Sequence, residues 1–407
     1  MNWKHTVILA IGISGTTSAS MADQVTGLVF TESNQADNSV LEFDRAADGA
    51  LSLAATVPTG GAGGGVVSVG SQGSVAVSQS QQYIFAANEG GNSISVLKRT
   101  ATGLTAVSTV SSGGALPVSI TVSGNLVYVL NDGVSGSSNA SITGFTFNNS
   151  TGALTPIANS TRSLSAPSPT LPAVGPIAPQ IQFDNTGHVL LVTETGTSLI
   201  DAYTINANGT PSQPLIQQSV GSSPFAIAFT PQNNLLVSEV RESLGTTGTG
   251  AVTSYQLSGG GTLTPISESV PDSQTAPCWI VVTPDGKFAY VVNTASGVIS
   301  GYQVGSNGVL SLLGNGVTAA TPAGPLDDAF LDGDLFDVTS GGSIIGFQQQ
   351  ADGALTPLDL SAIAPAGSRG LVAIAVPEAS TWAMMLLGFV GLAALGARKV
   401  RAATAAG

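Results

Sequence analysis

Cysteine and basic residues are scarce in this chain of 407 residues, and each shortage excludes a class of protein. Cys278 is the single cysteine, so no disulfide can form within the chain. The fold must therefore be held by its apolar core, which a chain of this length can supply. Lysine and arginine number 11 against 24 acidic residues. Nucleic acid is not an expected partner, because binding phosphate groups requires clustered cations.

Charged residues of both signs make up only 9% of the chain, while glycine is abundant at 51 residues. Such a composition can indicate disorder, but apolar residues make up 43% here and recur at regular intervals. Once the two ends described below are set aside, seven basic and 23 acidic residues remain, a net charge of about −16. An acidic surface of this kind favours solubility and repels anionic polymers.

The first 22 residues have the three-part layout of a secretory signal peptide. Lys4 and His5 precede an apolar run at residues 7–13, and small residues at 18–22 form a cleavage zone. An ordinary first strand is the alternative interpretation. The layout predicts that the chain is exported.

The last thirty residues combine a short polar motif, an uncharged apolar run at 382–397 and a basic end at Arg398, Lys399 and Arg401. The apolar run is slightly short for a membrane-spanning helix, which needs roughly 17–25 residues. It is too long and too rich in glycine and alanine for a strand. We predict a transmembrane helix whose basic end stays in the cytoplasm. A plain membrane anchor is one interpretation of this end.

Between the two ends, a unit of four short β-rich runs repeats along the chain. The clearest copy spans residues 277–313, with a tight turn at Pro284-Asp285-Gly286. The second run of the unit recurs seven times, about 45–60 residues apart, as expected for propeller blades. These second runs contain Leu28-Val29-Phe30, Tyr83-Ile84-Phe85, Val127-Tyr128-Val129, Leu190-Leu191-Val192, Leu235-Leu236-Val237, Tyr290-Val291-Val292 and Leu335-Phe336. The repeat predicts an all-β, seven-bladed β-propeller of four-stranded blades over residues 25–376.

The two ends of the repeat series predict how the ring closes. The first copy begins at its second strand, and an orphan strand at residues 370–376 follows the last copy. We expect this C-terminal strand to complete blade 1, because closure removes the exposed edges that an open sheet would leave.

The C-terminal region resembles the PEP-CTERM sorting signal of Gram-negative bacteria. The matching motif residues are Pro377, Glu378, Ser380, Thr381 and Trp382. The family motif usually repeats proline after the glutamate, whereas this chain has Ala379. The resemblance, over residues 377–401, implies recognition by an exosortase-type membrane protease. It also implies a protein that is anchored in the inner membrane and then reaches the cell surface or the extracellular space.

Three features of the repeat carry a second family resemblance: the segment Tyr290-Val291-Val292-Asn293, the turn before it and the recurring Gly-x-Leu-Thr-Pro endings. In these features the chain resembles the YVTN-repeat or lactonase-like seven-bladed propellers. The resemblance covers nearly the whole body. It implies either a lactonase acting on sugar lactones or a cycloisomerase acting on muconates. Active members carry arginine, histidine and glutamate around one mouth of the central channel.

Few residues of these types stand at the corresponding positions. Glu194 and Glu239 follow the second strands of blades 4 and 5, and Arg369 opens the closing strand. One interpretation is an acid/base pair with one cation, which makes these three the candidate catalytic residues. The alternative, which we favour, is that they satisfy polar groups at the channel mouth. One arginine is too few for a site that binds anions, which calls for several converging cations.

An acidic cluster in blade 7 is the candidate metal site. Asp332, Asp334 and Asp337 offer the oxygen ligands that calcium prefers, but Gly333 interrupts the run of ligands. An ordinary acidic turn is the alternative, and no other cofactor is expected.

The sequence thus predicts an exported, monomeric propeller with a binding or structural role at the cell surface or in the extracellular matrix. Its expected partners are the exosortase and an extracellular ligand or exopolysaccharide. The enzyme alternative is a lactonase-like hydrolase or cycloisomerase.

Overall fold

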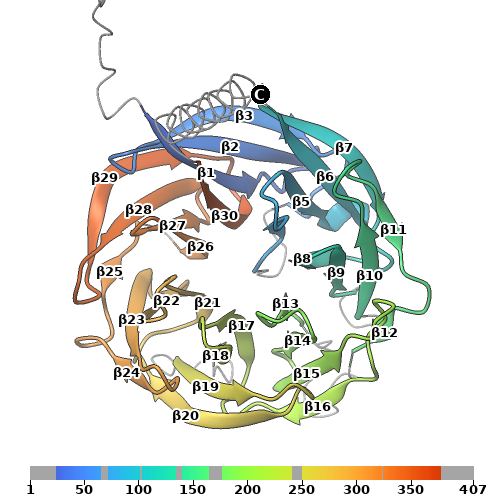
Figure 1. Ribbon diagram of the computed structural model, residues 1–407. Coiled ribbons are helices and arrows are strands. Elements are labelled where there is room, and N and C mark those ends of the chain that lie inside the picture. Colours follow the sequence, from blue (N-terminus) through green and yellow to red (C-terminus); the bar gives the residue numbers. More distant parts are fainter. Residues whose placement is uncertain are drawn as a thin grey trace, which may run out of the picture.

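The computed structural model describes residues 24–65, 72–100, 103–133, 140–164, 177–240, 250–322 and 324–376. In these ranges the chain forms seven antiparallel sheets that stand side by side in a ring (Figure 1). The predicted seven-bladed propeller is therefore confirmed. Each predicted second run lies in the second strand of its blade.

Each blade has a ladder of four strands, here given from the innermost strand outward. Blade 1 contains β30 (Arg369–Ala375), β1 (Val25–Glu32), β2 (Ser39–Ala46) and β3 (Leu51–Pro58). Blade 2 contains β4 (Val75–Val77), β5 (Tyr83–Asn88), β6 (Ser93–Thr100) and β7 (Gly103–Ser111), with the 3-10 helix η2 (Glu89–Gly91) after β5. Blade 3 contains β8 (Pro117–Ser123), β9 (Leu126–Asn131), β10 (Ser141–Phe147) and β11 (Leu154–Pro156), and β12 (Arg162–Ser163) also pairs with β10.

The remaining four blades repeat this order. Blade 4 contains β13 (Ile181–Phe183), β14 (Val189–Glu194), β15 (Leu199–Thr204) and β16 (Leu215–Gln218). Blade 5 contains β17 (Pro224–Phe229), β18 (Asn234–Glu239), β19 (Ala251–Leu257) and β20 (Leu263–Pro271). Blade 6 contains β21 (Pro277–Val282), β22 (Phe288–Asn293), β23 (Val298–Val304) and β24 (Leu310–Leu312), and β25 (Ala319–Ala320) also pairs with β23. Blade 7 contains β26 (Pro325–Leu331), β27 (Asp334–Thr339), β28 (Ser343–Gln349) and β29 (Leu355–Ile363).

The turns that separate these strands have the chemistry their sequences predict. Before β22, the Asp285 carboxylate accepts hydrogen bonds from the Thr283 hydroxyl at 2.7 Å and the Lys287 amide at 3.1 Å. Gly286 follows with a φ of 70°, which is unfavourable for other residues. The turn before β29 uses Gly353 at φ 86°, and its carbonyl accepts a bond from the Tyr290 hydroxyl of blade 6 at 2.9 Å. The recurring glycine of these turns therefore also joins neighbouring blades.

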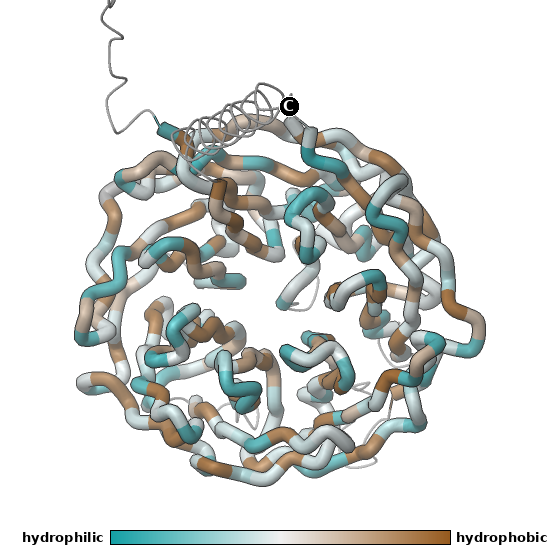
Figure 2. The backbone as a smooth tube through the Cα atoms, viewed as in Figure 1, coloured by the Kyte–Doolittle hydropathy of each residue, from teal (hydrophilic) through white to brown (hydrophobic). Residues whose placement is uncertain are grey.

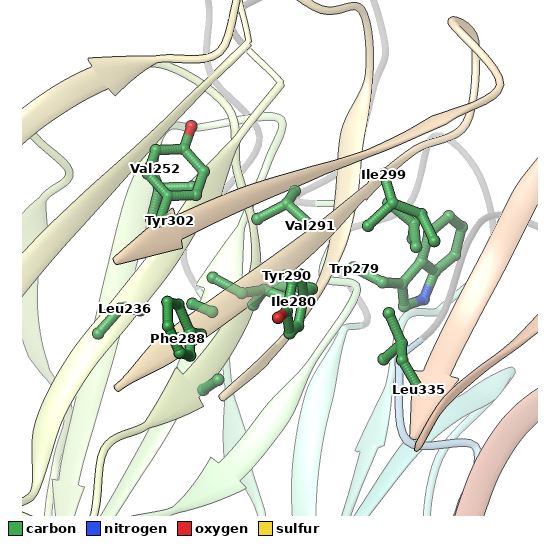
Figure 3. Close-up of a cluster of buried hydrophobic side chains, with 14 of the residues drawn as sticks. Leu236, Val252, Trp279, Ile280, Phe288, Tyr290, Val291, Ile299, Tyr302 and Leu335 are labelled. Atoms are coloured by element: carbon green, nitrogen blue, oxygen red, sulfur yellow. The ribbon is translucent and has the colours of Figure 1, made fainter. Parts of the chain in front are cut away.

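The core consists of apolar clusters between the faces of adjacent blades. One cluster joins β17 and β18 of blade 5, β21 to β23 of blade 6, and β27 and β28 of blade 7. Figure 3 shows part of it, with Trp279, Tyr290 and Leu335 among the buried side chains. In Figure 2, apolar stretches lie along the strands of the blades around the ring. No blade can bury both of its faces alone, so the ring is the unit of stability.

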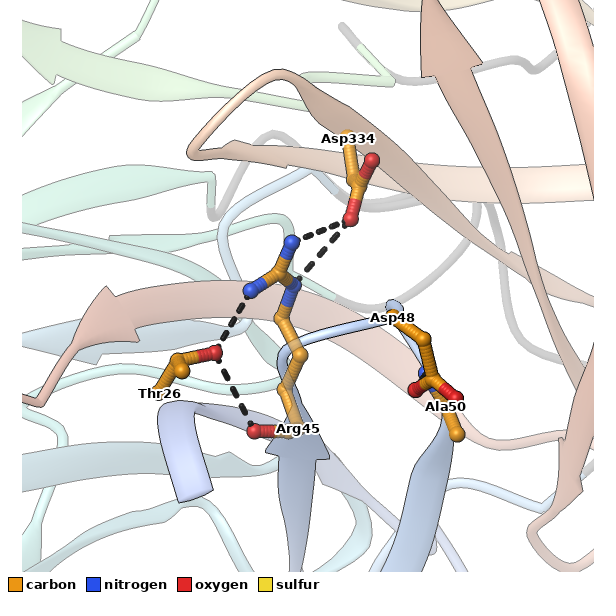
Figure 4. A network of polar contacts seen from close by, with 5 residues as sticks. All are labelled: Thr26, Arg45, Asp48, Ala50 and Asp334. Atoms are coloured by element: carbon orange, nitrogen blue, oxygen red, sulfur yellow. Dashed lines mark hydrogen bonds and ion pairs between the residues drawn. The ribbon is translucent and has the colours of Figure 1, made fainter. Parts of the chain in front are cut away.

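The C-terminal strand β30 closes the ring, as predicted. It pairs antiparallel with β1, from Gly27 opposite Ala375 to Glu32 opposite Arg369. A buried ion pair also links blade 1 to blade 7, because Arg45 at the end of β2 bonds the Asp334 carboxylate of β27 (Figure 4). The Arg45 guanidinium donates a further bond to the Thr26 hydroxyl at 2.7 Å.

The direction of the strands defines two faces of the ring. On the proline face the innermost strands begin, four of them at Pro117, Pro224, Pro277 and Pro325, and the second strands end. On the opposite face, here called the terminal face, β30 ends at Ala375 and β1 begins at Val25. Both ends of the propeller therefore leave from the terminal face.

In the part of the chain that the structure describes, no helix is long and apolar enough to cross a membrane. The predicted signal peptide at 1–22 and the predicted membrane helix at 382–397 lie outside the described residues.

Candidate functional site

The candidates Glu194 and Glu239 occupy one position of the blade repeat, the last residue of the second strand. In all seven blades this position is polar and at most 1% exposed. The seven residues are Glu32, Asn88, Asn131, Glu194, Glu239, Asn293 and Thr339. They form a buried polar ring on the proline face.

Hydrogen bonds hold these side chains, some within one blade and some between blades; Asn88 of blade 2, for example, accepts a bond from the Asn38 amide of blade 1 at 3.1 Å. The Glu239 carboxylate accepts bonds from the hydroxyls of Thr253 and Ser269, the latter at 2.6 Å, and from the Gly221 amide at 3.0 Å. In blade 6 the Asn293 amide makes the equivalent bond to the Ser300 hydroxyl at 2.8 Å. In blades 5 and 6, glutamate and asparagine therefore serve the same purpose and tie the second strand to the third.

Glu194 has a similar setting in blade 4. Its carboxylate accepts a bond from the Thr197 hydroxyl at 2.6 Å. Asp201 of β15 lies beside it, and burial, together with the charge of Glu194, raises the pKa of Asp201 to about 7. Their mutual repulsion disfavours the state in which both carboxyls are ionised.

The third candidate, Arg369, is not brought together with Glu194 or Glu239. It lies between blades 1 and 2, and its guanidinium is 3.5 Å from the Glu89 carboxylate. Glu32 pairs with Arg369 in the ladder between β1 and β30 and accepts a bond from the Asn38 amide at 3.0 Å. Arg369, Glu32 and Glu89 form what we call the mouth cluster. The catalytic role of Glu194, Glu239 and Arg369 stays a prediction.

Burial sets the electrostatics of the mouth cluster. Glu32 is fully buried, and its pKa is raised to about 8. Loss of solvation is the main cause and the charge of Glu89 adds to it, whereas the hydrogen bond from Asn38 and the charge of Arg369 act in the opposite direction. On the next blade, burial also raises the pKa of Asp132 to about 7. At neutral pH Glu32 is therefore largely a neutral acid.

Glycine-rich backbone packs over the residues that flank the mouth cluster. The Asn34 side chain bonds Gly65 at 3.0 Å and Gly64 at 2.6 Å. A β-carbon added to Gly61 would lie 2.4 Å from the Asn88 side chain, so only glycine fits there. With Glu32 and Glu89 at most 1% exposed, solvent does not reach the carboxylates of the mouth cluster in this structure.

Sequence reasoning missed Glu32 and Glu89. Glu32 stands two residues after Leu28-Val29-Phe30, the same offset as Glu194 from Leu190-Leu191-Val192, so the repeat alignment already contained the signal. Nothing in the sequence predicted that Glu89, on η2, meets Arg369, which comes 280 residues later.

The candidate calcium ligands do not converge. Asp334 is paired with Arg45, and Asp337 lies on the opposite side of β27 because side chains alternate along a strand. Asp332 is in the turn between β26 and β27 with a φ of 49°. Among the described residues, no group of three histidine, cysteine, aspartate or glutamate side chains could hold a metal ion. The motif residues Pro377, Glu378, Ser380, Thr381 and Trp382 lie outside the described residues.

Comparison with protein families gives two matches. The family described as lactonase, 7-bladed β-propeller, matches residues 29–171 and 164–324. The PEP-CTERM protein-sorting motif matches residues 375–401. No curated protein matches the chain.

Solved structures of similar architecture include enzymes and other proteins. A candidate 6-phosphogluconolactonase from Bacteroides fragilis is 18% identical, with a TM-score of 0.68 over 88% of this chain and 100% of the other. The periplasmic gluconolactonase of Pseudomonas aeruginosa is 18% identical, with a TM-score of 0.65 over 86% and 99%. Virginiamycin B lyase from Staphylococcus aureus is 16% identical, with a TM-score of 0.50 over 74% and 87%. At these identities the likeness is one of fold.

Proposed function

The chain belongs to the lactonase family of seven-bladed β-propellers, and we propose that it is an exported ligand-binding member that does not hydrolyse lactones. One observation carries this proposal. The acidic side chains at the proline face, where the family resemblance places the reactive groups, are buried and bonded within the fold. A hydrolase needs its acid, base and cation in contact with the substrate.

The sorting motif supports a role outside the cytoplasm. A PEP-CTERM motif marks a protein for export through membrane-associated sorting by an exosortase. Val376, the residue before Pro377, is still bonded to the propeller, because its amide donates to the Thr26 carbonyl at 2.8 Å. We propose that the terminal face is turned toward the inner membrane before release, and that the delivered protein serves at the cell surface or in the extracellular matrix, where an exopolysaccharide is a fitting ligand.

A lactone assay tests the absence of hydrolysis. We expect the full chain, purified in detergent, to leave the rates of opening of glucono-1,5-lactone and of 6-phosphoglucono-lactone at their spontaneous values. The physical reason is the closed mouth cluster. A pH-stat records acid release with and without protein. Acceleration that disappears in Arg369→Met but persists in Arg162→Met, an arginine on the outer strand β12, would establish an enzyme instead.

The second candidate function is that enzyme, and the raised pKa of Glu32 favours it. A carboxylic acid that is neutral at pH 7 beside an arginine can protonate a leaving oxygen while the cation stabilises developing negative charge. If turnover is found, Glu32→Gln should lower kcat by about 100-fold or more. Glu268→Gln, at an exposed position of the outer strand β20, is the control and should change kcat little.

The sorting proposal predicts a shortened mature protein. We expect mass spectrometry of the protein from its host to show a chain that begins after residue 22 and lacks residues 383–407. A strain without the exosortase should retain the C-terminal residues. An intact C-terminus in both strains would show that the region is a permanent anchor.

A further inference from the structure

One class of motif in the chain has no part in ligand binding or sorting, the Asn-x-Ser/Thr triplet that accepts N-linked glycans in exported proteins. The sequence contains five such triplets, all between residues 139 and 210, although asparagine occurs from residue 2 to residue 315. They begin at Asn139, Asn148, Asn149, Asn159 and Asn208, of which the first lies outside the described residues. The other four asparagines are exposed, and all four belong to the neighbouring blades 3 and 4.

Three of these asparagines mark separate places at the outer rim of the two blades. Asn148 is in the turn between β10 and β11, Asn159 lies between β11 and β12, and Asn208 is in the turn between β15 and β16. Figure 1 shows β11, β12 and β16 on the outside of the ring. The Arg162 guanidinium of β12 joins the two blades here, because it bonds the carbonyls of Asn159 and Ser212, each at 2.9 Å. A bulky group attached at these positions would extend into solvent, away from the channel.

The turn at Asn208 holds the parts of its triplet together. The Asn208 side-chain oxygen accepts hydrogen bonds from the Thr210 amide at 3.1 Å and from the Thr210 hydroxyl at 2.7 Å. The oxygen of Asn148 similarly accepts from the amides of Ser150 at 2.9 Å and Thr151 at 3.1 Å. The side-chain nitrogens of both asparagines donate to no group in the part of the chain that the structure describes. Each carboxamide is therefore fixed through its oxygen, while the nitrogen that would carry a glycan is left free.

Equivalent turns of other blades show that the Asn208 turn does not need its hydroxyl. In blade 7 the turn has Asp352, whose carboxylate accepts from the Ala354 amide at 3.0 Å. In blade 6 it has Asn307, whose side-chain oxygen accepts from the Val309 amide at 3.4 Å. Aspartate serves as well as asparagine there, and alanine or valine stands where blade 4 has threonine. The fold alone therefore requires neither the asparagine nor the hydroxyl of the Asn208 turn.

We propose that Asn148 and Asn208 are N-glycosylation sites that are modified after export. The donor is an oligosaccharide joined to a membrane lipid through a diphosphate, since transfer to a weakly nucleophilic amide requires a good leaving group. The asparagine side-chain nitrogen forms a bond to the anomeric carbon of the first sugar, and the bond from that carbon to the diphosphate oxygen breaks. The amide loses one proton, which the released lipid diphosphate takes up. This inference rests on the export that is part of the proposed function, and it is independent of the ligand.

The two sites are expected to differ in occupancy. Pro211 follows the Asn208 triplet directly, and the Arg162 guanidinium of blade 3 bonds its carbonyl. That triplet is therefore held against the neighbouring blade, whereas residues 148–151 form an exposed turn. Because a transferase must bind the triplet in its own active site, we expect a larger glycosylated fraction at Asn148.

Mass spectrometry of peptides from the mature protein of its host tests the proposal. We expect the peptides that contain Asn148 and Asn208 to carry a mass increment made of sugar units, located on the asparagine by electron-transfer fragmentation. The peptide with Asn307 is the matched control and should be unmodified, because its turn lacks the hydroxyl. Thr210→Val, which copies the turn of blade 6, should lower the modified fraction at Asn208 at least tenfold, whereas Thr210→Ser should retain it. An unchanged Tm in both variants shows that the turn is intact.

The same spectra separate this inference from the proposed function. Unmodified Asn148 and Asn208 in a chain that has lost residues 1–22 would overturn the glycosylation sites and leave export standing. A chain that retains residues 1–22 would contradict export, and the sites with it. Sugar on Asn307, or an increment at Asn208 that survives Thr210→Val, would show attachment that ignores the triplet and would also overturn the sites.

Discussion

Replacing Arg45 with methionine is expected to destabilise the propeller by about 3–5 kcal/mol, because the change leaves a buried charge without its partner. Arg45 and Asp334 are 5% and 4% exposed, and they join blade 1 to blade 7, where the two ends of the chain close the ring. Figure 4 shows the guanidinium bonded to both Asp334 and Thr26. Urea unfolding of the full chain should show a lower midpoint with an unchanged slope.

Two further variants decide whether the unpaired charge is the cause. Arg45→Met combined with Asp334→Leu should recover most of the loss, since replacing both partners of a buried pair by apolar groups is often neutral. Lys287→Met removes an exposed ion pair with Asp285 at 2.9 Å and should change the midpoint little. Equal losses in Arg45→Met and in the double variant would instead assign the effect to lost packing.

The blade repeat and its closure could be predicted because both follow from local patterns. The turn residues and the β-rich runs recur with one period, and the orphan strand at the C-terminus had one open position to fill, beside β1. The two-residue turn at Asp332-Gly333 places Leu331 opposite Asp334 and hence Asp328 opposite Asp337. That register was also readable from the sequence, and it places Asp337 beside Asp328, away from Asp334.

The candidate site could not be predicted to the same extent, because it depends on which blades meet. Arg369 comes from the closing strand and reaches Glu89 of the neighbouring blade, a contact set by the order of blades around the ring. The local signal at Glu194 and Glu239 marks a position that is polar and buried in every blade, so it does not single out one blade. A repeat pattern therefore reveals a residue whose structural role recurs in every blade more readily than a residue whose role is confined to one blade.

The propeller is expected to lose stability as the pH rises from 5 to 8, the reverse of what salt-bridged carboxylates cause. Among the carboxyls whose pKa is raised by burial, six have the largest increases: Glu32, Asp132, Asp201, Asp327, Asp328 and Asp337. In the unfolded chain the same groups titrate near pH 4. Between these values the folded state binds more protons, so the free energy of unfolding falls with pH.

The size of this effect follows from the number of groups. Each contributes a slope of up to about 1.4 kcal/mol per pH unit between its two pKa values. Two groups with folded pKa values near 7 would lower the free energy of unfolding by about 5 kcal/mol between pH 5 and pH 8. Thermal unfolding of the full chain across this range measures the loss as a falling Tm.

Asp337→Asn separates this linkage from a general effect of net charge. The asparagine is neutral at every pH, so the variant should match the wild type at pH 5 and be more stable at pH 8. Asp48→Asn removes one charge at an exposed turn and should leave the pH profile in place. A wild-type Tm that rises from pH 5 to pH 8 would mean that these carboxyls are ionised in the fold.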